Sequence, residues 1–435
     1  MKTLALCEVG EKDLKLGNRI KRIRLLKGLK QADICHGIIS PTHYSNIENC
    51  RYTPSIDTLK LLAGRLEVPE RYFHNIYEDT TEMQNILSTL ETKIEKESVE
   101  EVRQFLDLHQ VQFQYIPSVR QEYYFMLLKF LALVKMEQDN LAIELYENEI
   151  STVEIDESQL FVSTRYQYLY VTAVYHYYVG DYKISGEMFK RLLLTSEDQL
   201  LKARISYNIA MSHYHLCQFE YALSYAIEAK DLYLKLHEWM KAGDSYNLIS
   251  ILLIEKNEFK QAVEFINKGL NICRPEFHNL KALLHHNYAF ILFQTNQLDE
   301  ALSQIDFAIK YKKTVSYADK FVSKRLRLEI LLKLNQLETL ECEMDILENS
   351  ILTNKQRAGY YFLVAKVEYE KGNFVKYEDF IQQSIEIFKE HIDLKELKQA
   401  SEHYATYLAM NKKYKKAFEM QLLCTECLKK YVGEN

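Results

Sequence analysis

Three asparagines recur at a nearly constant spacing: Asn208, Asn247 and Asn287 lie 39 and 40 residues apart. An asparagine side chain donates and accepts hydrogen bonds at once, which matches the C=O and N–H groups of an extended peptide backbone. Three rungs in register, at a strand rise of about 3.3 Å per residue, predict a bound peptide of roughly 5–8 residues. The alternative is that each asparagine is a helix-interior polar residue satisfied locally or by water.

Other residues next to these asparagines could complete a peptide site. An aromatic side chain or a histidine directly precedes each asparagine, and an arginine one turn earlier or in the next repeat could bind a carboxylate. The predicted peptide-binding set is Arg204, Tyr207, Asn208, Tyr246, Asn247, His286, Asn287 and Arg325.

The elements that must position the asparagines are repeated helical hairpins. A short polar turn, then an aromatic residue or leucine, recurs at Tyr182, Phe219, Phe259, Leu298, Leu337, Phe374 and Tyr414, with spacings of 37 to 40 residues. A weaker copy precedes them at Leu141. Alanine often follows three residues later, and a small residue lies nine positions before, which lets paired helices approach closely. The period resembles that of tetratricopeptide repeats, although it is longer than 34 residues. Eight or nine repeats over about residues 82–430 are expected to form a right-handed superhelix with a concave groove.

The N-terminal part has a different pattern. Apolar residues at helical spacing predict helices over 16–27, 31–36 and 41–49, and a fourth that begins after Ser55. Ser40 and Ser55 are suited to cap the third and fourth helices. Short helices joined by a tight turn at Gly37 form a helix-turn-helix.

Charge is distributed unevenly between these two parts. Residues 1–72 contain 13 Lys and Arg against 8 Asp and Glu, a net charge of +5, although the whole chain carries −6. A basic head on an acidic body indicates that the head alone meets a polyanion. The alternative is a helical cap with a basic surface and no DNA role.

The head resembles the phage-repressor-type (Cro/CI, XRE) helix-turn-helix family through three stretches: LG-RI--IR--KGL-Q, then S-----IEN, then PS-DTL--LA--L-VP. In that family the helix from Pro41 to Asn49 enters the major groove. The resemblance implies DNA contacts by Gln31, Pro41, Thr42, His43, Asn46 and Arg51, with Gln31 and Arg51 at the phosphate backbone. Two departures are Lys30 in place of a Ser/Thr cap and Cys50 in place of glycine. Asn49 or Cys50 must therefore adopt a left-handed or extended backbone.

Composition limits the remaining possibilities. Glycine (12) and proline (5) are scarce in 435 residues, which favours an all-α protein over an all-β one. No apolar run is long enough for a membrane span. The eight scattered cysteines indicate free thiols in a reducing cytoplasm. No metal site or cofactor is expected: Cys424 and Cys427 form a single CxxC, and residues two apart, such as His213 and His215, point different ways on a helix.

The two halves together resemble the peptide-pheromone quorum-sensing receptors of Gram-positive bacteria, the Rap/Rgg/NprR/PlcR/PrgX group, and the chain length is most similar to the NprR branch. The resemblance implies a non-enzymatic cytoplasmic transcriptional regulator. It would be a homodimer or higher homo-oligomer, would bind an operator, and would be controlled by a short imported peptide. The predicted domains are a lambda-repressor-like DNA-binding domain (1–72), a helical linker (73–98) that relays the signal, and a peptide-binding and oligomerisation domain (99–435).

Two other functions remain open. One is a Rap-like phosphorelay inhibitor or phosphatase that acts on a response-regulator protein, for which Gln104 and Gln110 could orient water. The other is a repeat scaffold for a protein partner. The asparagine ladder favours a short extended peptide over a folded partner.

Overall fold

The computed structural model describes residues 15–74, 76–152, 162–312, 317–348, 353–391 and 393–432. All regular elements in these ranges are helical, so the all-α prediction is confirmed. The chain divides into two compact units, residues 1–192 and 193–435. No helix in the described ranges is both long and apolar enough to cross a membrane.

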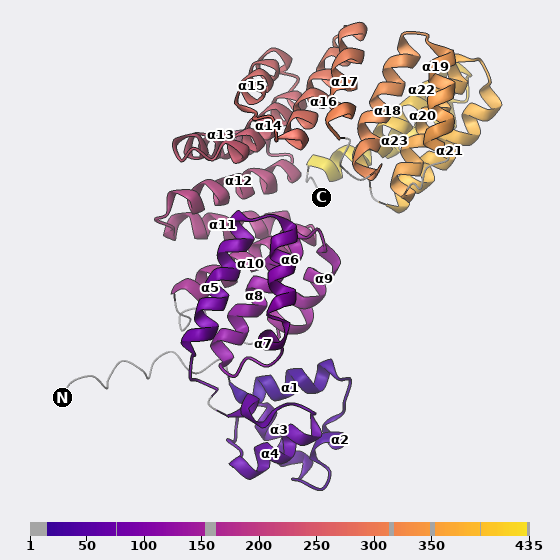
Figure 1. Cartoon of the computed structure of the whole chain (residues 1–435). Coiled ribbons are helices and arrows are strands. Elements are labelled where there is room, and N and C mark those ends of the chain that lie inside the picture. The colour runs from indigo at the N-terminus through magenta and orange to yellow at the C-terminus, as the bar shows by residue number, and fades with distance from the viewer. Residues whose placement is uncertain are drawn as a thin grey trace. The chain divides into compact units, whose positions relative to one another are not determined.

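The N-terminal helices form a small bundle (Figure 1). Its elements are α1 (Leu16–Leu26), α2 (Gln31–Cys35), α3 (Pro41–Glu48), α4 (Ile56–Arg65) and the 3₁₀ turn η1 (Glu70–Phe73). The predicted caps are present, since Ser40 Oγ accepts from the His43 N–H and Ser55 Oγ from the Thr58 N–H. We call these residues, 15–74, the head. Its core is apolar and includes Ile20, Ile34, Tyr44, Ile47 and Leu62.

The end of α3 has the predicted irregular backbone. Cys50 has a φ of 59°, in the left-handed region that glycine usually occupies. Gly17 of α1 packs closely against the end of α3. A Cβ on Gly17 would lie 2.1 Å from the carbonyl oxygen of Ile47 and 2.7 Å from Cys50 Sγ. Only glycine lets α1 approach the end of α3 this closely.

Between the head and the second unit, the described residues form seven helices and a π-helical turn: α5 (Thr81–Lys96), α6 (Val99–Leu108), α7 (Gln110–Gln114), α8 (Val119–Lys135), α9 (Asp139–Leu145), η2 (Tyr146–Ile150), α10 (Val162–Tyr178) and α11 (Tyr182–Thr195), of which α11 extends past the boundary at residue 192. The segment predicted as a linker, 73–98, consists mostly of α5. Met83, Leu87 and Leu90 of α5 form an apolar cluster with Phe113 and Leu128, so α5 belongs to the packed body of this unit. The predicted domain boundaries stay a prediction.

The second unit consists of helical hairpins, each a first and a second helix. These are α12 (Gln199–His215) with α13 (Phe219–Lys235), α14 (Trp239–Glu255) with α15 (Phe259–Ile272), α16 (His278–Gln294) with α17 (Leu298–Tyr311), α18 (Tyr317–Lys333) with α19 (Leu337–Glu348), α20 (Asn354–Glu370) with α21 (Phe374–Glu390), and α22 (Leu394–Met410) with α23 (Tyr414–Val432). From α14 to α20, the first helix of each repeat also contacts the first helix of the next.

The recurring aromatic or leucine marks a helix start in every repeat. Tyr182, Phe219, Phe259, Leu298, Leu337, Phe374 and Tyr414 are each the first residue of a second helix. Two positions before each of them the chain has a positive φ, at Gly180, Cys217, Asn257, Asn296, Asn335, Gly372 and Lys412. A left-handed residue ends the preceding helix and reverses the chain, and glycine and asparagine adopt it at least cost.

Candidate nucleic-acid interface and peptide site

The predicted base-contacting residues of α3 are exposed to differing degrees. Pro41 and Thr42 are exposed, and His43 and Asn46, one turn later, are half-buried. The His43 ring packs edge-on against Tyr52, with centroids 4.3 Å apart, which restrains its orientation. Thr42 and Asn46 can donate to or accept from base edges.

Gln31, predicted at the phosphate backbone, is bound within the head. Its Nε2 donates to Glu48 Oε2 at 2.6 Å. The same carboxylate, which is buried, accepts from Arg24 Nε at 2.5 Å and Nη2 at 3.0 Å. The Glu48 hydrogen bond raises the pKa of Arg24. This cluster ties α1, α2 and α3 together, and sequence analysis missed it although it had singled out Glu48 within the family motif.

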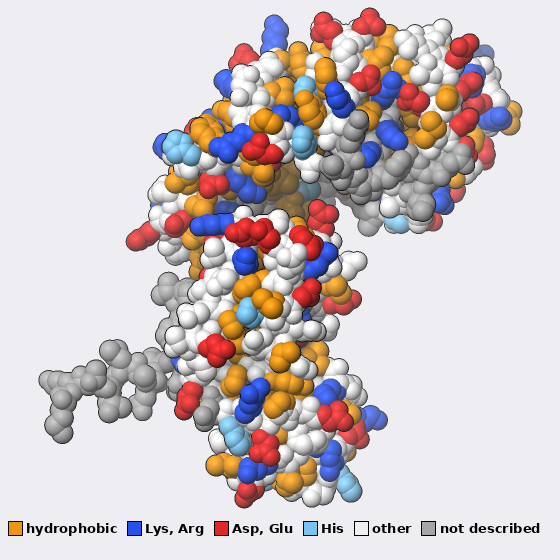
Figure 2. All heavy atoms as spheres, viewed as in Figure 1, with side chains coloured by type: hydrophobic (Ala, Val, Ile, Leu, Met, Phe, Trp, Pro, Cys, Tyr) orange, Lys and Arg blue, Asp and Glu red, His pale blue; other side chains and the backbone are white. Residues whose placement is uncertain are grey.

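Not all of the positive charge of the head faces outward. Arg19 and Arg24 are buried, and together with Arg22 they form ion pairs inside the first unit. The exposed basic residues of the head include Lys21, Lys30, Arg51 and Lys60. Figure 2 shows acidic and basic side chains interspersed on the visible face. The charge available for phosphate is therefore smaller than the count in the sequence suggests.

In the second unit, the structure brings two of the three asparagines together. Asn287 Nδ2 of α16 donates to Asn247 Oδ1 of α14 at 2.8 Å, and Ser250 Oγ donates to the carbonyl oxygen of Asn247 at 2.7 Å. Within the described residues, Asn247 Nδ2 and Asn287 Oδ1 have no protein partner, and both residues are half-buried. Neighbouring repeats thus present one donor and one acceptor, the pair that a peptide unit needs.

The other predicted peptide-binding residues on α12 and α14 differ in how deeply they are buried. Arg204, Tyr207 and Asn208 lie half-buried on α12, and Tyr207 packs against the apolar core. Tyr246 is only 8% exposed and lies against Gly269 of α15, so a peptide contact would require its side chain to move.

His286 and Arg325 lie in a polar cluster on α16 and α18. His286 Nδ1 is 3.1 Å from Ser323 Oγ, which also accepts from Lys312 Nζ at 3.3 Å. Burial, Lys312 and Arg325 lower the pKa of His286 to about 4, so the ring is neutral near pH 7.

The guanidinium of Arg325 already has a carboxylate within the chain. Its Nη2 donates to Glu396 Oε1 at 2.5 Å, and Glu329 lies 3.9 Å away. Burial lowers the pKa of Arg325, but the two carboxylates raise it above its ordinary value. A peptide carboxylate would have to compete with Glu396. The adjacent Lys395 binds Glu255 of α14 at 2.6 Å, so the first turn of α22 contacts two earlier repeats.

A cavity of about 360 Å³ lies between the first helices α20 and α22. Lys366 Nζ lies 4.3 Å above the Phe362 ring and 3.3 Å from Glu329. Aromatic walls with a charged rim suit a large side chain. Sequence analysis did not single out this cavity, whose lining residues are Phe362, Lys366, Tyr369, Gln399, Glu402, His403, Thr406 and Tyr407.

Comparisons with known proteins agree with this architecture. Residues 20–73 match the helix-turn-helix family. The chain therefore has a helix-turn-helix domain near its N-terminus, followed by tetratricopeptide-like helical repeats, and the predicted fold class is confirmed.

Several known proteins match most of this chain. The transcriptional activator NprA of Geobacillus stearothermophilus is 22% identical over 91% of this chain and 99% of its own. The apo form of the quorum sensor NprR from B. thuringiensis (TM-score 0.64, 14% identical) matches 80% of this chain and 99% of its own, and NprR with its cognate peptide NprX (0.60, 13%) matches 81% and 99%. A Rap protein in complex with Competence and Sporulation Factor (0.63, 15%) matches 81% and 99%. The predicted resemblance to the Rap–NprR group is confirmed.

Proposed function

We propose that this protein is a transcriptional regulator that binds DNA through α3 and is controlled by a short signalling peptide bound to the second unit. One observation carries the proposal: the Asn247–Asn287 pair presents a donor and an acceptor on neighbouring repeats, in the same chain as a helix-turn-helix. Two relatives support it, since NprA is a transcriptional activator and NprR binds its cognate peptide NprX.

The proposed DNA site contains Pro41, Thr42, His43 and Asn46 at base edges, with Arg51 at phosphate. Gln31 reaches phosphate only if it leaves Glu48. A homodimer would present two such helices to half-sites about 34–36 Å apart, or a multiple of that distance. A regulator of this kind acts where the DNA is, in the cytoplasm.

The proposed peptide site centres on Asn247 and Asn287. Asn208 and Arg204 would extend the site along α12, and Tyr207, Tyr246 and His286 would flank it. Arg325 would bind a carboxylate of the peptide after its own guanidinium leaves Glu396. The peptide backbone would bind the free amide N–H of Asn247 and the free C=O of Asn287. Its side chains would bind between the repeats.

Isothermal calorimetry tests the peptide site. Candidate peptides come from the C-terminal ends of small secretory reading frames beside the gene, and each is titrated into wild-type protein and the Asn247→Ala variant. We expect micromolar or tighter binding to the wild type and a loss of about 1–3 kcal/mol in the variant, because a buried peptide group is left unpaired.

Asn267→Ala is the matched control, because Asn267 is an exposed asparagine on the second helix α15. It should bind the peptide as the wild type does. Equal losses in both variants would refute the asparagine site. If no peptide binds, the remaining functions are a scaffold for a protein partner or a phosphorelay inhibitor.

A further inference from the structure

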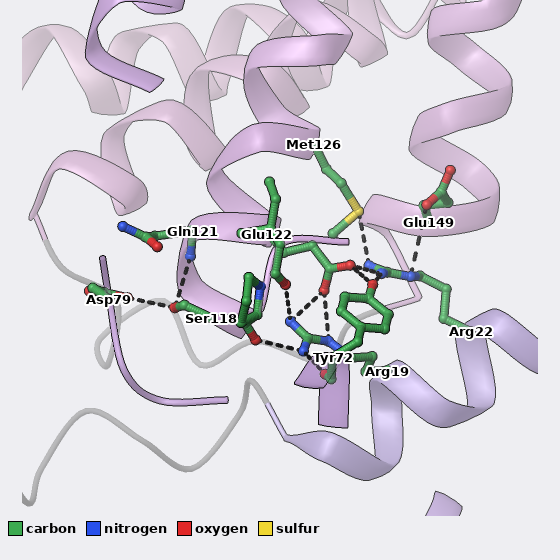
Figure 3. A network of polar contacts seen from close by, with 11 residues as sticks. Arg19, Arg22, Tyr72, Asp79, Ser118, Gln121, Glu122, Met126 and Glu149 are labelled. Carbon is green, nitrogen blue, oxygen red and sulfur yellow. Dashed lines mark hydrogen bonds and ion pairs between the residues drawn. The ribbon is translucent and has the colours of Figure 1, made fainter. Parts of the chain in front are cut away.

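A buried arginine joins the head to the helices that follow it in the first unit (Figure 3). Arg19 of α1 is only 3% exposed. Its Nε donates to Glu122 Oε2 of α8 at 2.9 Å, and its Nη1 donates to the carbonyl oxygens of Tyr72 at 2.6 Å and Pro117 at 2.7 Å. The guanidinium also lies 4.2 Å from the centroid of the Tyr72 ring. A planar fork with this many acceptors permits essentially one orientation.

Glu122 is the shared acceptor of this cluster. Its Oε1 accepts from Arg22 Nη2 at 2.5 Å and from the hydroxyl of Tyr72. Arg22 Nη1 reaches Met126 Sδ at 3.0 Å, and its Nε lies 3.8 Å from Glu149. One carboxylate, 8% exposed, therefore compensates two arginines of the head.

The chain between the head and α8 is held at the same place. The Val119 N–H donates to the carbonyl oxygen of Ile76 at 2.8 Å, and Ser118 Oγ donates to Asp79 Oδ1 at 2.5 Å. Gln121 Nε2 donates to the carbonyl oxygen of Thr80 at 2.8 Å, and its Oε1 accepts from the Thr80 N–H at 3.2 Å. Segment 76–80 is thereby bonded to the start of α8.

Each side of this junction has an apolar core of its own. The head core contains Ile34, Ile47 and Leu62, and the core of the next helices contains Leu87 and Leu128. A buried ion pair contributes little net stability, but removing one partner is strongly unfavourable. The polar cluster is therefore suited to define an orientation rather than to drive folding.

We propose that Arg19, Arg22 and Glu122 are positioning residues, which hold the DNA-binding head in one orientation on α8. They do not contact DNA. They act through the recognition helix, whose direction relative to the first repeat helices they determine. The proposal rests on the proposed function only in so far as the head binds DNA.

Glu122→Gln is the decisive substitution. It leaves two buried guanidinium groups facing a neutral amide, and separation of the head from α8 would let both be solvated. Since each side keeps its own apolar core, we expect the junction to open before either side unfolds. Glu100→Gln is the control, because Glu100 is an exposed carboxylate on α6, 3.8 Å from Arg103.

Hydrogen exchange of the full-length protein measures that opening. In Glu122→Gln, amides in 70–80 and 115–122 should exchange faster by a factor on the order of a hundred, because one partner of a buried pair is lost. Amides in 34–47 and 83–90 should keep their wild-type rates. A junction that exchanges as slowly as in wild type would overturn the proposal. Equal acceleration in 34–47 would overturn it as well, since the cluster would then stabilise the fold of the head.

DNA binding supplies a readout that a purely structural role would not change. Duplexes selected from a random pool with wild-type protein are rebuilt with altered half-site spacing. Wild type should prefer one spacing, whereas Glu122→Gln should bind a single half-site normally and lose the spacing preference. Weaker half-site binding with an intact preference would contradict positioning. If wild type selects no duplex, the proposed function fails, and the exchange result still decides whether the cluster holds the head.

Discussion

Charged side chains in this protein serve two purposes, and their surroundings decide which. Lys30 and Arg51 are exposed and available to phosphate, whereas Arg24 is bound to the buried carboxylate of Glu48. A buried guanidinium needs a counter-charge and hydrogen-bond acceptors, so it cannot also serve a distant polyanion. The number of Lys and Arg residues in the head therefore overstates the positive charge that can interact with a phosphate backbone.

His286 gives a pH dependence with a definite sign. Its pKa is lowered to about 4, below its ordinary value of about 6.5, so the unfolded chain takes up the proton first as pH falls. The neutral His286 ring therefore contributes fully to the free energy of unfolding above pH 6.5, and this contribution is lost as the pH falls from 6.5 to 4. We expect that loss to be on the order of 3 kcal/mol in urea unfolding of the second unit.

The matched variant for this measurement is His286→Gln, which cannot titrate. It should show a shallower fall in stability over the same pH range, since the other histidines still contribute. Parallel curves for the two proteins would show that His286 is protonated as readily in the folded state as in the unfolded one.

At the scale of elements, helix pairs depend on small residues at their closest points. Ala210, Ala289 and Ala365 are fully buried in first helices of repeats, nine positions before the second helix begins. In the head, Gly17 has the same function where α1 meets the end of α3. Because backbone atoms form the opposing surface there, they cannot move aside as a flexible side chain could.

Gly17→Ala should therefore disturb the recognition helix. The added methyl group would meet the Ile47 carbonyl oxygen at 2.1 Å, and we expect the head to lose about 1–3 kcal/mol. Hydrogen exchange in α3 would report this loss. The fluorescence of the single tryptophan, Trp239 of α14, reports on the second unit and should be unchanged.

Gly64→Ala is the control for that substitution. Gly64 lies inside α4 with nothing within 4 Å of an added Cβ, so alanine there should be neutral or stabilise by about 0.4–1 kcal/mol. If both variants behave alike, close packing at Gly17 is not the cause of any loss.

At the scale of the whole molecule, two ligands on one chain must be coupled reciprocally. If the peptide changes operator affinity by some factor, the operator must change peptide affinity by the same factor, in the range of about 5–150-fold for typical allosteric proteins. Calorimetry of the peptide with and without saturating operator measures one factor, and DNA titrations with and without peptide measure the other. Two factors that differ, or that both equal one, would refute control of DNA binding by the peptide.

Local sequence patterns predicted the helices of the head and the helical hairpins of the repeats, in their order along the chain. Helix starts could be predicted because capping serines, alanines and the recurring aromatic residues act locally, over one or two turns. The recurring aromatic residue or leucine, noted in the sequence for its period, proves to be the first residue of all seven second helices from Tyr182 to Tyr414. The family motif predicted the helix that begins at Pro41, and it limited the irregular backbone after that helix to Asn49 or Cys50, of which Cys50 has the positive φ.

Side chains that lie far apart in the chain find their partners only in the folded protein. Arg19 and Glu122 are 103 residues apart, and Arg325 and Glu396 are 71 apart, so no local pattern marks either pair. Among the predicted peptide residues, Asn247 and Asn287 came together because their spacing equals one repeat, whereas burial of Tyr246 depends on the neighbouring helix. Side-chain pairing across helices depends on distances that folding sets, and spacing in the chain predicts it only where the repeat imposes a constant geometry.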